Sequence, residues 1–122
     1  MVRITIPGRF PGLNEFIDAN RRKRGKYNPG NDMKQRDQKV IYQYLPRTRL
    51  KKRICIHYTF IEPNSRRDKD NIASYFIKIF QDALVRRGCI ENDNWLWIKG
   101  WTNEFEVDKG NPRIEIVIEE EQ

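Results

Sequence analysis

The fold is decided by residues 53–87, which read RICIHYTFIEPNSRRDKDNIASYFIKIFQDALVRR. The segment Arg53–Ile61 is nearly continuous in apolar and β-branched residues, which predicts a strand in the interior of its sheet. Pro63 follows it and favours a stop. Between Asp70 and Arg87, apolar residues recur at helical spacing and Gly88 comes next. This pattern predicts a long amphipathic helix directly after the strand.

Weaker patterns flank this unit on both sides. Further strands are expected at Val2–Ile6, Trp95–Trp101 and Arg113–Glu119, where apolar and polar residues alternate. A second helix is expected from Asn31 or Asp32 to about Leu45. The glycines, prolines and basic residues of Pro11–Asn31 predict a loop. The order β-α-β-α-β-β predicts a single α+β domain over residues 1–122, with a mixed sheet packed by two helices.

Charge is distributed unevenly along the chain. The formal net charge of +7 divides into +11 for Met1–Arg53 and −4 for Ile54–Gln122. A basic half predicts contact with a polyanion, and a solvated surface beside an acidic tail is the alternative reading. The candidate DNA-binding residues are Arg21, Arg22, Lys23, Arg24, Lys26, Lys51, Lys52 and Arg53, together with Arg66 and Arg67.

Several classes of protein are not expected. No apolar run approaches the roughly 20 residues of a membrane helix, and Met1–Phe10 lacks the pattern of a signal peptide, so we expect a cytoplasmic protein. Cys55 and Cys89 have no partner at metal-ligand spacing and are interpreted as structural, as is His57 in its predicted strand. No glycine-rich phosphate loop or nucleophile elbow is present, so no organic cofactor is expected.

Carboxylates are the remaining candidates for chemistry. Asp68 and Asp70 precede the long helix, and residues two apart in an extended segment project to the same side. Asp93 lies in the polar connection that follows the helix. If the three acids converge, their oxygens suit Mg²⁺. The alternatives are that Asp68 or Asp70 caps the helix, that Asp93 closes a turn, and that Lys78 and Asp82 form an exposed ion pair.

The same residues carry a family resemblance. The run Arg66-Arg67-Asp68-Lys69-Asp70-Asn71-Ile72, followed by Asp82-Ala83-Leu84, Gly88 and Asn92-Asp93, resembles the motif of the RusA family of Holliday junction resolvases. Pro11-Gly12-Leu13-Asn14-Glu15 and the basic stretch after it resemble the N-terminal region of phage members of that family. The resemblance covers essentially the whole chain.

The resemblance implies a Mg²⁺-dependent homodimeric endonuclease that nicks two opposed strands of a four-way DNA junction. By position, Asp68, Asp70 and Asp93 match the metal-binding catalytic acids of the family. The family lysine falls on Ser74 when counted forward from Asp70-Asn71, and on Lys78 when counted back from Asp82, so Lys78 is assigned this role. Two alternatives stay open: a DNA-binding protein without catalysis, and a nuclease of the same fold that cuts flaps, forks or RNA.

Overall fold

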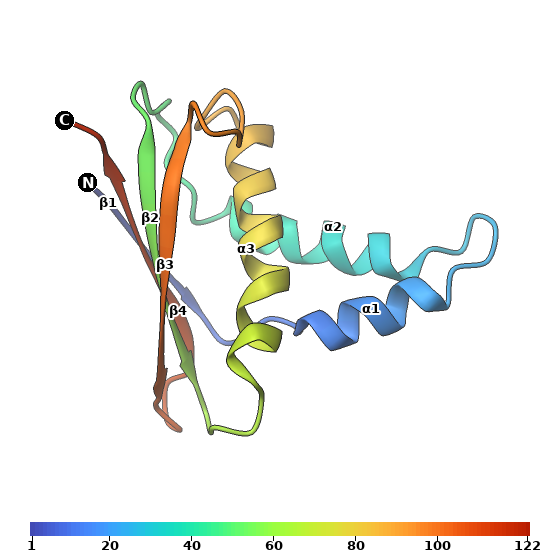
Figure 1. Ribbon diagram of the computed structural model, residues 1–122. Helices are drawn as coiled ribbons and strands as arrows, with labels where there is room; N and C mark the ends of the chain where they lie inside the picture. The colour runs from blue at the N-terminus through green and yellow to red at the C-terminus, as the bar shows by residue number, and fades with distance from the viewer.

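Four strands form one mixed sheet in the order β1-β4-β2-β3 (Figure 1). In the computed structural model, which describes residues 1–122, these are β1 (Val2–Pro7), β2 (Ile54–Glu62), β3 (Ile98–Val107) and β4 (Arg113–Glu120). The β1–β4 and β4–β2 pairs are antiparallel, whereas β2 and β3 are parallel. The predicted α+β class, the mixed sheet and the interior position of the central strand are therefore confirmed.

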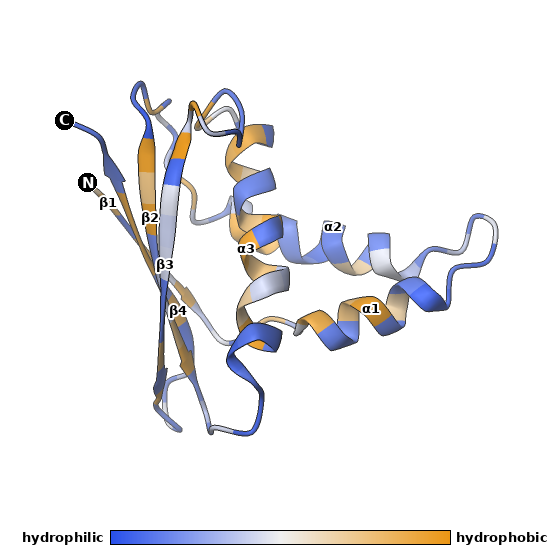
Figure 2. Cartoon of the chain, viewed as in Figure 1, coloured by the Kyte–Doolittle hydropathy of each residue, from blue (hydrophilic) through white to orange (hydrophobic).

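One long helix connects the two parallel strands. This helix, α3 (Lys69–Arg86), packs along one face of the sheet (Figure 1). Two further helices, α1 (Leu13–Arg21) and α2 (Pro29–Tyr42), lie side by side and extend outward from α3, away from the sheet. The hydrophobic residues of α3 face the sheet, and its hydrophilic ones face away (Figure 2). No helix is long and apolar enough to cross a membrane.

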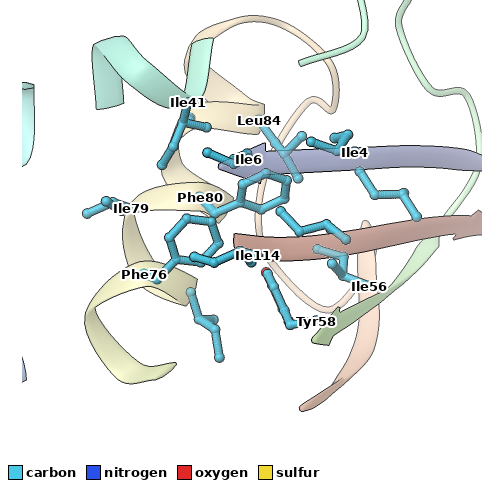
Figure 3. Close-up of a cluster of buried hydrophobic side chains, with 14 of the residues drawn as sticks. Ile4, Ile6, Ile41, Ile56, Tyr58, Phe76, Ile79, Phe80, Leu84 and Ile114 are labelled. Atoms are coloured by element: carbon cyan, nitrogen blue, oxygen red, sulfur yellow. The ribbon is translucent and has the colours of Figure 1, made fainter. Parts of the chain in front are cut away.

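The core forms where α3 meets β2. Tyr58 and Phe60 of β2 pack edge-on against Phe76 of α3, with ring centroids 6.1 and 5.9 Å apart, and Tyr58 lies 5.8 Å from Phe80 (Figure 3). Edge-to-face pairs at this spacing add stabilisation beyond the area they bury. Isoleucines of β1, β2 and β4 complete the cluster. The apolar residues of the 53–87 unit therefore form the centre of the domain, as their spacing predicts.

The prediction of a loop at Pro11–Asn31 was wrong, because α1 lies inside it. Ala19 is fully buried, and the ring of Phe16 lies 4.9 Å from that of Tyr75 on α3. The Asn71 side chain accepts a hydrogen bond from the backbone N–H of Asn14 at 2.8 Å. Leu13, Phe16 and Ile17 do recur at helical spacing, but a nine-residue helix is marginal without the tertiary contacts that stabilise it.

Two element boundaries also differ from the predicted ones. Helix α2 begins at Pro29 because Asn28 caps it, accepting a hydrogen bond from the Asn31 backbone N–H at 3.1 Å. Proline suits the first helical position, where an N–H has no partner. Strand β3 begins at Ile98 and continues to Val107, so Trp95–Trp97 form a turn instead of a strand. The second half of β3 is polar and mostly exposed.

Cys89 and His57 contact other residues of the fold, whereas the Cys55 side chain is partly exposed. The Cys89 thiol is buried, and burial raises its pKa, so it stays a neutral, unreactive group. His57 lies on the sheet face away from the helices, with its Nδ1 2.7 Å from Thr102 Oγ1 and its Nε2 3.5 Å from Glu119. Both ring nitrogens of His57 therefore have partners within the fold.

We predict that Gly30→Ala destabilises the protein by about 1–3 kcal/mol, because the new methyl group would overlap the side-chain amide of Asn20 where α1 and α2 meet. Urea unfolding would measure the change. Gly100→Ala is the matched control, since its methyl group would meet open space. Equal stability for the two variants would contradict the close approach of α1 to α2.

Candidate functional site

Asp68 lies immediately before α3 but does not cap it. It occupies the N-cap position with an extended backbone, and its side chain makes no capping hydrogen bond. Asp70 lies inside the first turn and accepts a hydrogen bond from Ser74 Oγ at 2.8 Å. The capping explanation therefore does not account for Asp68. A negative charge near the N-terminus of a helix interacts favourably with the helix dipole, so the positions of both acids are compatible with a stable α3.

The predicted extended geometry of these two acids was wrong. Since α3 begins at Lys69, Asp68 and Asp70 are separated by about 200° around the helix axis and do not share one side. Asp70 lines a groove beside Asn103, whereas Asp68 lines a neighbouring hollow beside Val107. The side chains of Lys69 and Phe105 line both spaces, so the two carboxylates flank the same pair of residues.

Two basic neighbours of these aspartates, Arg67 and Lys69, contact other groups. Arg67 donates two hydrogen bonds to Glu62, both at 2.9 Å, and a third to the Phe10 carbonyl at 2.9 Å. The Lys69 ammonium lies 5.6 Å from the centroid of the Phe105 ring. None of Asp68, Asp70 or Asp93 forms an ion pair, although the chain carries 24 lysines and arginines. Their negative charge is therefore available to a cation from solution.

A buried carboxylate organises this end of the sheet. Glu62, at the end of β2, is only 7% exposed and binds both Arg67 and Arg9, the latter at 3.0 Å. These contacts tie the chain before α1 and the chain before α3 to the last residue of β2. The direction in which the chain enters α3, and with it the position of Asp68, depends on this cluster.

Asp93 lies at the opposite end of α3. In its loop the two asparagines form the turn: Asn92 Oδ1 accepts the Asp93 N–H at 2.7 Å and Asn94 Oδ1 accepts the Leu96 N–H at 3.0 Å. The carboxylate of Asp93 has no such role, so the turn explanation does not account for it. The 18 residues of α3 span about 27 Å. The expected convergence of Asp93 with Asp68 and Asp70 therefore does not occur within one chain, where no three acids, histidines or cysteines are grouped closely enough to hold a metal ion.

A continuous groove joins the two ends. Between α3 and β3 lie a hollow of about 540 Å³ that contains Asp70 and a second of about 330 Å³ that contains Asp93. Gln81 and Trp101 line both hollows, so they meet in the middle. The sequence did not identify Gln81, Trp101 and Asn103 as candidates. These residues line the groove only because β3 pairs with β2 and so lies next to α3.

Lys78 lies in this groove on the same helix as Asp70. Its ammonium is 3.7 Å from Asp82, and Asp82 is also bound by Lys34 at 3.2 Å. The Lys78 side chain is 70% exposed, so this pair is weak and its ammonium can reach an anion in the groove. Ser74, the other position considered for the family lysine, is engaged by Asp70. Both positions line the groove one helical turn apart.

Five candidate DNA-binding residues lie at the tip of the α1–α2 pair. The chain turns back there through mutual backbone hydrogen bonds of 2.8 Å between Arg24 and Tyr27. The projecting tip is seen in Figure 1. The five are Arg21, Arg22, Lys23, Arg24 and Lys26. All are exposed, and only Arg22 has an acidic neighbour, Asp18, at 4.0 Å. This tip offers the chain's densest array of positive charge to a polyanion.

The other candidate basic residues divide into free and bound groups. Lys51, Lys52 and Arg66 have exposed side chains without an ion pair. Arg53 donates two hydrogen bonds to Glu121, at 2.9 and 2.8 Å, and these raise the pKa of Arg53. Arg67 is held by Glu62, so we reassign it from DNA binding to the fold. Arg53 remains at the rim of the hollow that contains Asp93.

Neither a protein-family model nor a curated protein sequence matches this chain.

The absence of ion pairs leads to a prediction about stability. Asp68→Asn, Asp70→Asn and Asp93→Asn should each change the free energy of unfolding by no more than about 1 kcal/mol, as expected for exposed acids that form no ion pair. Glu62→Gln should cost about 3 kcal/mol because it leaves the guanidinium of Arg67 without its charged partner. Urea unfolding of the four variants would measure this difference. A large loss for any of the aspartate variants would assign that aspartate to folding.

Proposed function

We propose that the protein is a Mg²⁺-dependent, structure-selective endodeoxyribonuclease of the RusA type, which acts as a homodimer in the cytoplasm and resolves four-way DNA junctions by paired nicks. The observation that carries this proposal is that Asp68, Asp70 and Asp93 lack any basic partner in a chain rich in basic residues. The motif around these aspartates resembles that of the RusA family, and this resemblance is our basis for proposing the reaction and the DNA substrate.

The residues fit a magnesium ion. Mg²⁺ is bound in proteins by one or two carboxylates, keeps several waters and takes substrate phosphate oxygens as further ligands. Asp68 and Asp70 supply hard oxygen donors on either side of Lys69 and Phe105, in spaces open to solvent. When bound, the ion supplies Lewis acidity, which activates water and offsets charge on the phosphate.

The chain's own side chains then have separate roles. Asp68 and Asp70 would hold the cation, and Lys78, eight residues beyond Asp70 on α3, would direct its ammonium at a phosphate in the groove. Ser74 orients the Asp70 carboxylate through its hydrogen bond. Water attacks the phosphorus, the bond between phosphorus and the 3′ oxygen breaks, and the 3′ oxygen takes up a proton. A 3′-hydroxyl and a 5′-phosphate are therefore expected as products.

The basic tip supplies sequence-independent binding. Phosphate contacts position a protein on DNA without reading bases, and they account for most nonspecific affinity. Paired cuts require two equivalent sites, which a two-fold symmetric dimer provides. A nuclease with broader substrates and a DNA-binding protein without catalysis remain the two alternatives, and the following experiment separates them.

We predict cleavage of four-way junctions in Mg²⁺ and none in EDTA. Labelled four-way, three-way, flap, linear DNA and RNA substrates should be compared with wild type and Asp70→Asn. The variant should bind the junction but cut it at least about 100-fold more slowly, since it loses a charged ligand. Asp32→Asn, which removes another exposed acid without an ion pair, is the matched control and should cut normally. Equal cleavage by Asp70→Asn would refute the site, and cleavage of flaps or RNA in preference would favour the broader nuclease.

We also predict that the basic tip determines the salt dependence of binding. Replacing Arg21, Arg22, Lys23 and Arg24 with glutamine should reduce the slope of log affinity against log salt by about 3–4 if all four contact phosphates. Fluorescence anisotropy at several salt concentrations would measure it. Glutamine at Arg3 and Lys109, exposed residues on the sheet side, is the control and should leave the slope unchanged. An unchanged slope for the tip variant would assign the tip to solvated surface.

A further inference from the structure

A separate hollow of about 310 Å³ lies where α1 and α2 meet α3 (Figure 1). We call it the helical hollow. Its volume is at the lower end of the range of about 300–1,000 Å³ that is typical of small-molecule sites. Ser74 and Lys78 line both this hollow and the one that contains Asp70. The helical hollow therefore adjoins the proposed catalytic groove.

The walls of the helical hollow are apolar and largely aromatic. Leu13 and Phe16 of α1 line it together with Tyr75 and Ile79 of α3. The rings of Phe16 and Tyr75 lie 4.9 Å apart and are tilted by 36°. The Tyr75 hydroxyl donates a hydrogen bond of 2.6 Å to the buried carboxylate of Asp37 on α2, and this bond fixes the ring. A fixed apolar wall of this kind suits the face of a flat aromatic ligand.

Two lysines are the only charged residues that line the helical hollow. Lys34 and Lys78 both contact the carboxylate of Asp82, at 3.2 and 3.7 Å. One carboxylate shared by two ammonium groups leaves a net positive charge beside the hollow. A nucleotide carries the matching groups, a flat base and an anionic phosphate. An apolar side chain of another protein would match the walls but not the lysines.

The helical hollow also lies on the path that the proposed DNA contacts define. Phe16 comes five residues before Arg21, the last residue of α1, so the basic tip begins about 8 Å further along this helix. On the other side of the hollow, Ser74 is hydrogen-bonded to Asp70 at 2.8 Å. A strand whose phosphates contact both the tip and the groove would therefore pass the hollow.

We propose that the helical hollow receives one unstacked nucleobase of the DNA, which stacks on Phe16 while Lys34 and Lys78 contact neighbouring phosphates. This assignment rests on the proposed function, because it requires DNA in the adjoining groove. Moving a base out of its stack costs least where pairing or stacking is already interrupted. Bases at the centre of an open four-way junction lack a continuous stack on one side. The hollow would therefore favour branched DNA over a linear duplex.

Photo-crosslinking tests the contact without reference to cleavage. Four-way junctions that carry 5-iododeoxyuridine at successive positions beside the branch point would be bound to wild type in EDTA and irradiated. Iodouracil attaches mainly to aromatic side chains that contact it, so mass spectrometry should find the label on Phe16 or Tyr75. A linear duplex with the same label is the control and should give little of this product. Attachment only outside the hollow, or none, would overturn the proposal.

Removal of the aromatic face gives a second test. Phe16→Leu keeps an apolar side chain against Tyr75, but its affinity for a four-way junction should fall at least about fivefold, the lower end of the effect of losing one base–aromatic stack. Its affinity for a linear duplex should remain that of wild type, which also shows that the variant is folded. Ile17→Leu changes the next, exposed residue of α1 and is the matched control. Equal losses for the two DNAs, or no loss, would overturn the base site.

The two proposals fail in different ways. A wild type that binds and cuts junctions but attaches no label within the helical hollow would overturn the base site and leave the nuclease standing. A wild type that attaches the label to Phe16 or Tyr75 but cuts no substrate would support the base site and overturn the nuclease.

Discussion

The parallel pairing of β2 and β3 is the constraint on which the rest of the structure depends. Parallel neighbours need a crossover, and α3 provides it by running the full length of the sheet. The aromatic residues of this helix meet those of β2 to form the core. The same crossover places Asp68 and Asp70 at one end of the sheet and Asp93 at the other. The distribution of the acids is therefore a consequence of the connection that holds the domain together.

A second constraint is the buried carboxylate of Glu62. In an Arg-Arg-Asp-Lys-Asp segment, neighbouring charges would ordinarily neutralise one another, but Glu62 draws Arg67 inward and Lys69 lies over Phe105. The two aspartates are left without an ion pair as a result. A buried ion pair adds little net stability when compared with apolar packing, so its effect on which acids remain unpaired is the more important one.

The groove connects these two features with the exposed tryptophans. It is an open channel with a carboxylate near each end, and Trp95 and Trp101, which are 90% and 49% exposed, line it. The loop that carries Asp93 also carries Trp95, and both residues line the same hollow.

Local patterns in the sequence were enough to predict β2, α3, the α+β class and the core, since periodic apolar residues specify a strand or helix and the face it buries. They also identified the aspartates and the basic tip as candidates. They did not reveal α1, whose nine residues are stabilised by Phe16 against Tyr75 and by Asn71. Nor could they place Asp93 relative to Asp70, or show that Glu62 holds Arg67. Such distances and partners involve residues far apart in the chain, and only packing of α3 on the sheet decides them.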